Sequence, residues 1–187
     1  MNRKIVITGG CGFIGSHVAI SHKKSGDEVT IVDNMSTSGD ISTGVDSVMD
    51  LNLSECITGV DDVIKHADIV YHFASSVGVK HVDKDPRGSL QNSFNINNNM
   101  FPIFDRYNTR VIFASTSEVY GNTKEARETD TLQIGSPEVL RWGYACGKLM
   151  SEFLLRSYKT RSTIIRFFNV TGVGQLSTHG MVLPTFI

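Results

Sequence analysis

Cysteine is scarce in this chain of 187 residues, which contains only Cys11, Cys56 and Cys146, with no CxxC pair among them. An odd, scattered set does not form a disulfide framework or match the spacing of a zinc site, so we expect a reducing compartment and no metal. The sequence also lacks an apolar run long enough to cross a bilayer, and the apolar run near its start is too short for a signal peptide. We therefore expect a cytoplasmic protein with no membrane partner.

An excess of charge of either sign is also missing. The chain has 18 Lys and Arg against 19 Asp and Glu, a formal net charge of -1. This balance gives no electrostatic reason to expect nucleic acid or an anionic membrane as partner, so any bound phosphate must be held by a few well-aimed groups. The six histidines show no ligand-like spacing, and none is assigned to chemistry.

The pattern that does recur is a short β-branched run, then a glycine or polar turn, then a helical stretch. This alternation predicts an α/β fold of the Rossmann type, a doubly wound parallel sheet with right-handed crossovers. Strands covered on both faces read as short apolar runs without clean alternation. The expected strands are Ile5–Thr8, Glu28–Val32, Ser47–Met49, Ile69–Phe73, Val111–Ala114 and Thr163–Phe167, and the expected helices are Phe13–Lys24, Val60–Ala67, Leu90–Tyr107 and Trp142–Lys159.

A glycine motif lies between the first strand and the first helix. Gly9, Gly12 and Gly15 are spaced G-x-x-G-x-x-G, with Phe13 and Ile14 opening the helix. Glycine lets the backbone turn sharply and approach a pyrophosphate, whose charge rests on the helix N-terminus, and Gly15 lets the helix pack closely. Taken alone, the motif also fits a plain glycine turn.

An acid at the end of the second strand favours the dinucleotide interpretation. Asp33 follows Gly15 by 18 residues, close to the spacing of about 20 expected for the carboxylate that binds the adenosine ribose. A carboxylate there accepts the hydroxyls of NAD and repels the extra phosphate of NADP. Further contacts to the adenosine half are expected from Asn34, Ser36, Asp50 and Leu51.

The segment Tyr144-Ala145-Cys146-Gly147-Lys148 holds a Y-x-x-x-K pair, which shares one helix face at this spacing. An exposed helix pair is the plain alternative, but Ser115-Thr116-Ser117-Glu118 ends the preceding strand, at the sheet edge where ligands bind. A phenol, an ammonium and a hydroxyl brought together suit proton abstraction from an alcohol. Lys148 and a positive nicotinamide would lower the Tyr144 pKa, and Thr116 would hydrogen-bond the reacting oxygen.

At these residues the sequence resembles the extended short-chain dehydrogenase/reductase superfamily, in particular its NAD-dependent sugar-nucleotide epimerases, dehydratases and decarboxylases. The resemblance is carried by the glycine loop, Asp33, His72-Phe73-Ala74, Asn95, the segment from Ser115 to Gly121, the Tyr144/Lys148 pair and Arg166-Phe167-Phe168-Asn169.

The resemblance implies NAD as cofactor and gives roles to individual residues. Thr116, Tyr144 and Lys148 would be the catalytic triad, and Asn169 would touch the substrate diphosphate. The cofactor would be lined by Ala74, Asn95, Ser115, Tyr144, Lys148 and Phe168.

Within the superfamily, Leu140-Arg141-Trp142-Gly143 and Gly180-Met181-Val182-Leu183-Pro184 look most like UDP-glucose 4-epimerases. In that chemistry Tyr144 takes the proton of the C4 hydroxyl, and a 4-keto sugar is then reduced again on its other face. Dehydratases usually carry an Asp-Glu pair after the threonine, whereas here Glu118 stands alone after Ser117. Because Thr-Ser-Glu is what UDP-glucuronate decarboxylases show, that activity is the alternative.

Two questions about individual features stay open at this level. Glu118 is either an acid/base group or a hydrogen-bonding residue at a strand end. The chain itself is an enzyme or a non-catalytic NAD-binding module.

The domain organisation expected is an NAD-binding Rossmann domain over residues 1–168 and the start of an incomplete substrate-binding region over 169–187. The C-terminal substrate lobe would be truncated or absent. Two departures from the family pattern are Val173-Gly174-Gln175 in place of Pro-Arg-Gln, and Asn98 in place of a glycine. The expected partners are a UDP-linked sugar nucleotide and a second copy of the chain. The helices 90–107 and 142–159 would pair in such a homodimer, where Phe101, Phe104, Phe153 and Leu154 are either contact or core.

Overall fold

A parallel six-stranded sheet forms the centre of the computed structural model, which describes residues 2–36, 44–76 and 84–175. All five strand pairs are parallel, as the alternating pattern predicts. The six expected strands are therefore confirmed, with ends that move by one or two residues. They are β1 (Lys4–Thr8), β2 (Glu28–Asp33), β3 (Ser47–Asp50), β4 (Ile69–His72), β5 (Arg110–Thr116) and β6 (Ser162–Phe167).

The strand order is β3-β2-β1-β4-β5-β6, so the direction of winding reverses between β1 and β4. The register aligns the carboxyl ends of these strands, since Thr8 pairs with His72 across that boundary. In open α/β sheets ligands bind in the crevice outside the carboxyl ends of the strands at this reversal point. The topology thus marks one edge of the sheet before any side chain is considered.

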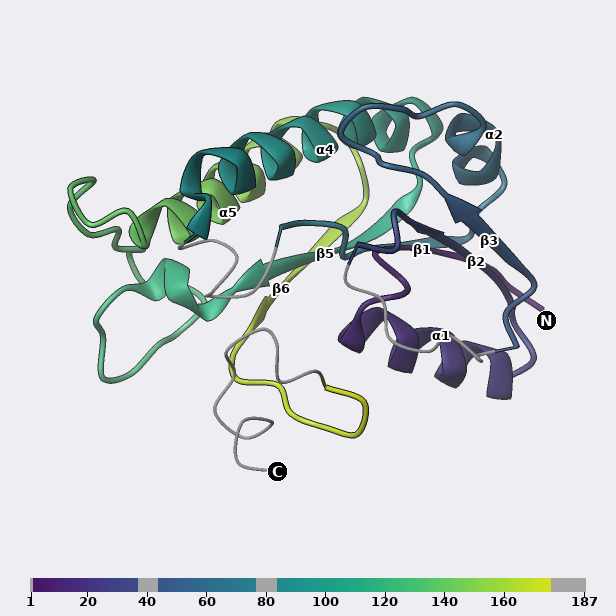
Figure 1. Cartoon of the computed structure of the whole chain (residues 1–187), viewed down its shortest axis with the longest axis horizontal. Coiled ribbons are helices and arrows are strands. Elements are labelled where there is room, and N and C mark those ends of the chain that lie inside the picture. The colour runs from purple at the N-terminus through teal and green to yellow at the C-terminus, as the bar shows by residue number, and fades with distance from the viewer. Residues whose placement is uncertain (1, 37–43, 77–83, 176–187) are drawn as a thin grey trace.

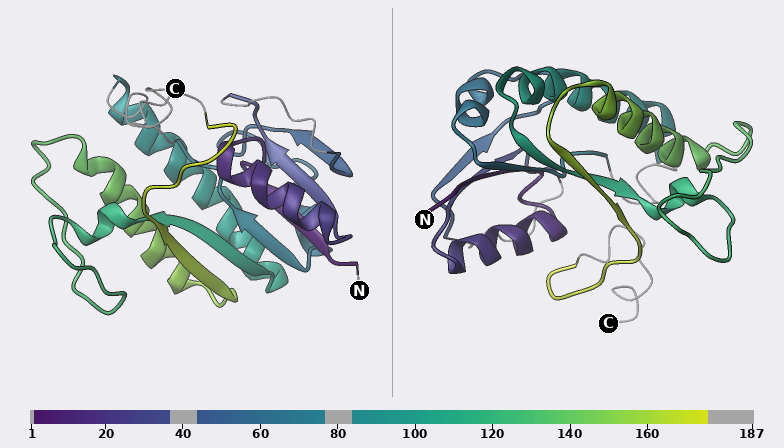
Figure 2. Two further views of the ribbon diagram at one scale, coloured as in Figure 1. Left: turned by 90° about the horizontal axis from the view of Figure 1, so that it is seen from below. Right: turned by 180° about the vertical axis from the view of Figure 1, so that it is seen from behind.

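Helices cover the sheet on both faces, which makes three layers (Figures 1 and 2). The helices α2, α4 and α5 lie along one face, and α1 lies on the other. After β6 the chain crosses to the α1 side, where the His17 ring is hydrogen-bonded to the Val173 carbonyl at 2.9 Å. The bounds are α1 (Phe13–Lys24), α2 (Val60–Lys65), α4 (Pro86–Tyr107) and α5 (Trp142–Ser157), and a 3-10 turn, η1 (Ser117–Tyr120), follows β5.

The helix ends follow local sequence. The helix α1 stops where expected, because Gly26 takes a φ of +82° and donates its N–H to the Lys23 carbonyl at 3.0 Å. The helix α4 begins four residues earlier than the expected Leu90, since Asp85 caps it by accepting from the Gly88 N–H at 2.9 Å and Pro86 occupies its first turn. An aspartate followed by proline is a standard helix start, and it extends α4 by a turn.

Two apolar clusters form the core, one against each face of the sheet. The larger one lies under α2, α4 and α5 and includes Phe101 and Phe104, both with 0% exposure. These two rings are therefore core residues, whereas Phe153 on α5 is 70% exposed.

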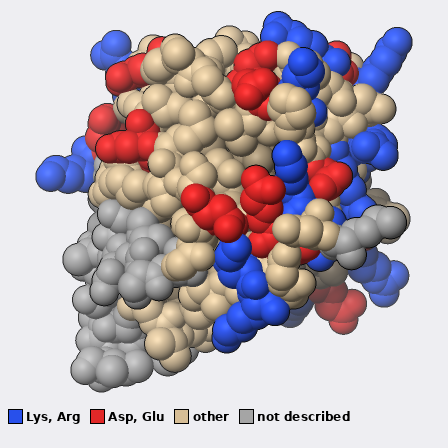
Figure 3. All heavy atoms as spheres, turned by 90° about the vertical axis from the view of Figure 1, so that its right-hand side faces the viewer, with Lys and Arg blue, Asp and Glu red and all other residues tan. Residues whose placement is uncertain are grey.

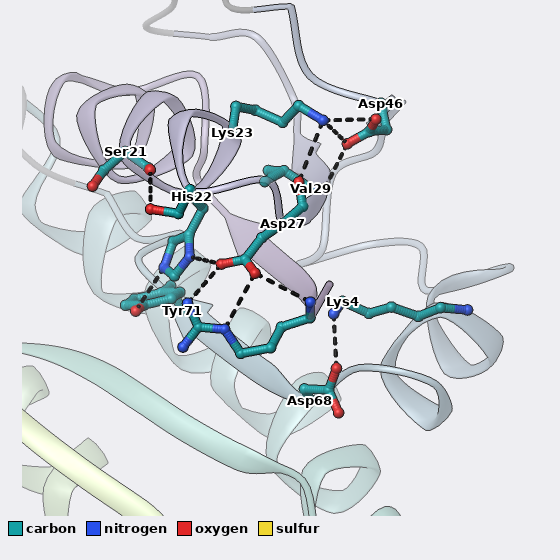
Figure 4. A network of polar contacts seen from close by, with 11 residues as sticks. Lys4, Ser21, His22, Lys23, Asp27, Val29, Asp46, Asp68 and Tyr71 are labelled. Carbon is teal, nitrogen blue, oxygen red and sulfur yellow. Dashed lines mark hydrogen bonds and ion pairs between the residues drawn. The ribbon is translucent and has the colours of Figure 1, made fainter. Parts of the chain in front are cut away.

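A polar network ties the amino ends of the strands together, at the edge opposite the reversal point (Figure 4). Asp27 is 2% exposed and accepts hydrogen bonds from the backbone N–H and the guanidinium of Arg3, at 3.1 and 2.7 Å. The His22 ring bridges the Asp27 carboxylate, at 2.7 Å, to the Tyr71 hydroxyl, at 2.9 Å. The Arg3 and His22 hydrogen bonds hold the pKa of Asp27 well below its ordinary value. These hydrogen bonds and the ion pair therefore stabilise the fold at this end of the sheet.

The face that carries the N-terminus and α2 mixes acidic and basic side chains (Figure 3). That view shows no broad field of one sign, which agrees with the balanced composition. Within the described ranges, none of the helices combines the length and the apolar character that crossing a membrane requires.

Candidate functional site

The carboxyl edge of the sheet gathers the residues that the sequence singled out. Thr8 ends β1, Asp33 ends β2, His72 ends β4 and Thr116 ends β5. The glycine loop follows β1 and Ala74 follows β4, so both flank the reversal point. The candidate site is therefore built on loops and side chains from four neighbouring strands.

The glycine loop is packed so tightly that most of its positions exclude a side chain. A Cβ at Gly9, whose φ is +69°, would lie 2.7 Å from the Ala74 nitrogen. A Cβ at Gly15 would lie 2.3 Å from the Gly9 carbonyl oxygen. Gly10, which sequence reasoning passed over, would place a Cβ 2.7 Å from the Ile31 side chain. These glycines let α1 and the end of β4 close around the loop.

Gly12 differs, because packing does not account for it. A Cβ there would come no closer than 3.4 Å to any atom beyond its chain neighbours, and its φ of -72° suits any residue. Gly12 is also the N-cap of α1, with no side chain to cap the helix and no acid in the first turn. The first N–H groups of a helix lack intrahelical partners and attract anions. The start of α1 at Gly12 is therefore suited to bind an anion such as the pyrophosphate of NAD.

This contrast gives a first prediction. Gly12→Ala should change the free energy of unfolding by less than about 1 kcal/mol but weaken NAD binding about tenfold or more, because the methyl group enters the phosphate space. Gly15→Ala should cost several kcal/mol, roughly 2–4, because backbone atoms cannot move aside. Urea unfolding and calorimetric NAD titration of both variants measure this. Equal loss of stability in the two would show that Gly12 is also a packing residue.

Asp33 fastens the glycine loop to the end of β2. Its two carboxylate oxygens accept from the backbone N–H groups of Cys11 and Met35, each at 2.9 Å. Each oxygen has a further lone pair, so the carboxylate retains capacity for ribose hydroxyls. Burial and the nearby Asp33 raise the pKa of the Cys11 thiol to about 12, which leaves it neutral and unreactive.

The other residues expected near adenosine lie beside Asp33 at the ends of β2 and β3. Asn34 and Ser36 are exposed, and Oδ1 of the Asn34 side chain accepts from the Ser36 N–H and hydroxyl, at 3.1 and 2.7 Å. Asp50 pairs in register with Asp33, and Leu51 donates its N–H to the Asp33 carbonyl at 2.9 Å. The structure thus brings these four residues to one corner of the sheet edge.

Lys148 reaches from α5 across β5. Its ammonium donates to the Ala114 carbonyl at 2.9 Å and lies 5.2 Å from the centre of the Phe113 ring. Only 6% of the residue is exposed, and this burial lowers its pKa to about 8. Lys148 and Tyr144 line one small cavity of about 20 Å³, as their shared helix face predicts. Because Ala114 is two residues before Thr116, the strand and helix bring the three expected catalytic residues to the same end of the sheet.

Tyr144 lies beside a carboxylate. Burial and the charge of Glu118 raise the pKa of Tyr144 to about 12. This shift is opposite to the lowering expected for the complex, where a positive nicotinamide is added. Glu118 in turn lies 3.5 Å from the guanidinium of Arg141, a partner that sequence reasoning did not foresee. Glu118 also donates its N–H to the Thr116 hydroxyl at 3.2 Å, so it takes part in the capping of η1 as well as lying beside Tyr144.

The lowered pKa of Lys148 predicts a pH-dependent cost of holding this residue. Below pH 8 the folded chain carries a buried charge, and between about 8 and 10.5 stability rises with pH because the unfolded chain binds more protons. Lys148→Met should therefore raise the free energy of unfolding at pH 7 by about 1–3 kcal/mol, a gain that shrinks as the pH rises above 8. Urea unfolding from pH 7 to 10 measures it, with Lys159→Met, at an exposed position just after α5, as control. A gain independent of pH would refute this explanation.

A buried ion pair lies behind Thr116. The guanidinium of Arg166 binds the Glu152 carboxylate through two hydrogen bonds, at 3.0 and 2.7 Å, and also donates to the Tyr120 hydroxyl at 3.1 Å. The same carboxylate accepts from the Ser115 hydroxyl. Ser115, expected to line the cofactor, thus directs its hydroxyl toward α5. The hydrogen bonds to Glu152 and Tyr120 hold the pKa of Arg166 above its ordinary value.

Three residues expected at the cofactor or the substrate, Asn95, Phe168 and Asn169, have exposed side chains. Asn95 is on the exposed side of α4, whereas Asn97, two residues on, is 4% exposed and faces His72 and Ser151. Phe168 is 65% exposed and stacks on Tyr120 with ring centres 6.2 Å apart.

Asn169 is exposed in the segment after β6. The segment Gly180–Pro184, used above for choosing within the superfamily, lies outside the described residues. In the parts of the chain that the structure describes, His, Cys, Asp and Glu form no group that could hold a metal.

Comparison with known proteins points to one family. Residues 5–187 match the sequence profile of the NAD dependent epimerase/dehydratase family. The UDP-N-acetyl-alpha-D-glucosaminuronate decarboxylase of Bacillus cytotoxicus is 33% identical over 201 residues, which cover 100% of this chain and 61% of that protein. The UDP-glucose 4-epimerase of Azospirillum brasilense is 30% identical over 97% of this chain and 53% of that protein.

The fold has similar solved structures. The UDP-N-acetylglucosamine 4-epimerase of Methanobrevibacter ruminantium M1, in complex with UDP-N-acetylmuramic acid, superposes with a TM-score of 0.86 at 27% identity. The match covers 99% of this chain and 61% of that one. The chain therefore spans between 53% and 61% of the length of these proteins.

Proposed function

This chain belongs to the NAD-dependent epimerase/dehydratase family, and on that premise we propose that it binds NAD and oxidises the C4 hydroxyl of a UDP-linked sugar. The observation that carries the proposal is the placement of Lys148, which α5 delivers onto the Ala114 carbonyl beside Thr116. The uncapped N-terminus of α1 at Gly12, at the same sheet edge, supports a dinucleotide whose reactive end meets that group. We further propose the division expected from the sequence, with residues 1–168 as the NAD-binding domain and 169–187 as the start of a substrate-binding region.

When bound, NAD accepts hydride from the sugar carbon. The chain's own residues handle the proton. The Tyr144 side chain takes the proton of the reacting hydroxyl as the phenolate, and its raised pKa of about 12 means that the phenol must first be helped to ionise. Lys148 supplies a buried positive charge, which favours the phenolate through space. Thr116 hydrogen-bonds the reacting oxygen. The negative charge of Glu118 opposes the ionisation of Tyr144.

A 4-epimerase is the first candidate for the complete reaction. It returns hydrogen to the other face of the 4-keto sugar, and needs no further acid. The similarity to two 4-epimerases supports it.

Decarboxylation of a UDP-uronic acid is the second candidate, because of one observation in the site. Glu118 is paired with Arg141 at 3.5 Å next to Tyr144, and this gives the site a carboxylate and a cation that a 4-epimerase does not require. The 33% identity to a UDP-uronate decarboxylase also favours it.

Product analysis separates the candidates. The chain is incubated with NAD and, separately, UDP-glucose, UDP-N-acetylglucosamine and their uronic acids, and products are followed by NMR and by release of labelled carbon dioxide from C6. A C4 epimer supports the first candidate, whereas a pentose and carbon dioxide support the second. Glu118→Gln should leave epimerisation within about threefold but lower decarboxylation about a hundredfold. Absence of both products and of NAD reduction with all four substrates would contradict the proposed activity.

We also propose a homodimer that pairs α4 and α5. Apolar side chains on these helices are exposed, including Phe94 at 43%, Met150 at 44% and Phe153 at 70%. Sedimentation equilibrium should give twice the chain mass, and a monomer at all concentrations would contradict the pairing.

A further inference from the structure

A continuous chain of buried hydrogen bonds connects the two halves of the candidate site. It runs through the side chains of Thr8 on β1, His72 on β4, Asn97 on α4 and Ser151 on α5, which are at most 4% exposed. The Thr8 hydroxyl lies 2.7 Å from Nδ1 of His72, and Nε2 of His72 lies 3.1 Å from Oδ1 of Asn97. Nδ2 of Asn97 donates to the Ser151 hydroxyl at 2.7 Å. Four separate elements are thus joined through one histidine.

The donor and acceptor of each hydrogen bond in this series follow from the last bond, the one that Ser151 makes. The Ser151 hydroxyl has one hydrogen and donates it to the Gly147 carbonyl at 2.7 Å, so it must accept from Asn97. The carbonyl of the Asn97 amide then faces His72, which requires that Nε2 of His72 carry the proton. Nδ1 is left as an acceptor for the Thr8 hydroxyl. In this direction both hydroxyl hydrogens in the series, those of Thr8 and Ser151, have an acceptor.

The surroundings of His72 keep it neutral. Its ring lies among the rings of Phe101, Phe104 and Phe113, with centres 5.8, 5.3 and 5.9 Å away. Burial, despite the Asn97 hydrogen bond, lowers the pKa of His72 to about 4. A neutral imidazole is one donor and one acceptor, which is what the middle of a directed chain needs.

The two ends of the chain touch the two halves of the site. At one end the Thr8 hydroxyl accepts from the Ala74 N–H at 3.3 Å, and Ala74 is the residue against which Gly9 packs. At the other end Ser151 holds the carbonyl of Gly147, the residue before Lys148. A shift of α5 relative to β1 and β4 would break at least one of these bonds and leave a buried polar group unpaired.

We propose that His72, Asn97 and Ser151 are positioning residues that keep the active-site helix α5 aligned with the cofactor cradle at Thr8 and Ala74. The inference rests on the proposed function, because it assigns the cradle to NAD. The three side chains act through Lys148 and the glycine loop. Neither the reacting atoms nor the cofactor needs to touch them.

The tautomer of His72 tests the direction of the chain without any ligand. Nitrogen-15 NMR of the whole chain at pH 7 should show a neutral His72 ring with the proton on Nε2. The side chain of Asn97→Asp cannot donate to Ser151 when it is ionised. This variant should therefore lose the hydrogen-bonded connection between His72 and Ser151. A His72 ring protonated on Nδ1 would overturn the proposed series of hydrogen bonds.

A double-mutant cycle on NAD affinity tests the alignment. Thr8→Val breaks the cradle end and Ser151→Ala the helix end, and each should weaken NAD binding about tenfold. Because either change breaks the same chain, the double variant should bind no more than about twofold weaker than the weaker single variant. Ser157→Ala is the matched control, since its hydroxyl donates to the Leu154 carbonyl at 2.7 Å on the exposed last turn of α5, and it should leave the affinity within about twofold.

The outcomes separate this inference from the proposed function. Multiplied losses in the double variant, about a hundredfold, would show that the two ends act independently and would overturn the positioning chain alone. No change on Ser151→Ala in a chain that binds NAD would do the same. Failure of the unaltered chain to bind NAD would instead remove the proposed function, and the inference with it.

Discussion

Tyr144→Phe should lower turnover of the responsive UDP-sugar by about a thousandfold while NAD still binds with nearly unchanged affinity. The change removes only the phenolic oxygen that is proposed to take the substrate proton, and general acid–base groups typically contribute factors of about 10²–10⁴. The ring stays to fill its half-buried position at the start of α5. Steady-state kinetics and calorimetric titration with NAD give the two numbers.

Tyr158→Phe is the control for this experiment. Tyr158 caps the other end of α5, and its ring packs against Phe101 with centres 6.4 Å apart. Loss of its hydroxyl should leave turnover within about twofold. Comparable losses in the two variants would show that Tyr144 matters for packing and would remove it from the chemistry.

Glu152→Ala should cost about 3–5 kcal/mol of unfolding free energy. It would leave the Arg166 guanidinium, whose side chain is 18% exposed, without its carboxylate and the buried Ser115 hydroxyl without its acceptor. Breaking a buried pair from one side is far more costly than replacing both partners, because one charge stays behind unpaired. Urea unfolding at pH 7 measures the loss.

Two further variants make this result interpretable. The double change Glu152→Leu with Arg166→Met removes both charges of this pair and should recover most of the stability. Arg106→Ala breaks the surface pair with Asp61, in which the Arg106 side chain is 60% exposed, and should cost less than about 1 kcal/mol. A loss below that level for Glu152→Ala would mean that the ion pair does not hold α5 to β5 and β6.

The fold could be predicted from the sequence because its determinants are local. Short β-branched runs alternate with amphipathic stretches, and Gly26 marks the end of α1 by its left-handed conformation. The start of α4 was missed even though it too is local, since Asp85 and Pro86 are a start signal that the apolar pattern from Leu90 onward overshadowed. The 3-10 turn η1 is capped by the Thr116 hydroxyl, which accepts from the Glu118 N–H, and no periodicity reveals such a contact.

The candidate site could be predicted only where the residues that act together lie within one short sequence motif. Tyr144 and Lys148 share a helix turn, and the glycine loop is contiguous. The series of hydrogen bonds from Thr8 to Ser151 joins residues on four elements, so it forms only when the protein is folded.

One distant contact did leave a trace in the sequence. Glu152 follows Lys148 by four residues, so it lies on the same face of α5, and a carboxylate on a buried face requires a cation. Arg166 in the last strand was available as that cation, but nothing in the sequence pairs the two uniquely.

A crystal structure of the chain with NAD and a UDP-sugar tests the central claim most directly. The account predicts the pyrophosphate over Gly12 at the start of α1, the adenosine ribose on Asp33, and the nicotinamide ring beside the Tyr144 hydroxyl. An ordered NAD seated elsewhere on the sheet, or a nicotinamide that lies beyond the reach of Tyr144 and Lys148, would contradict it.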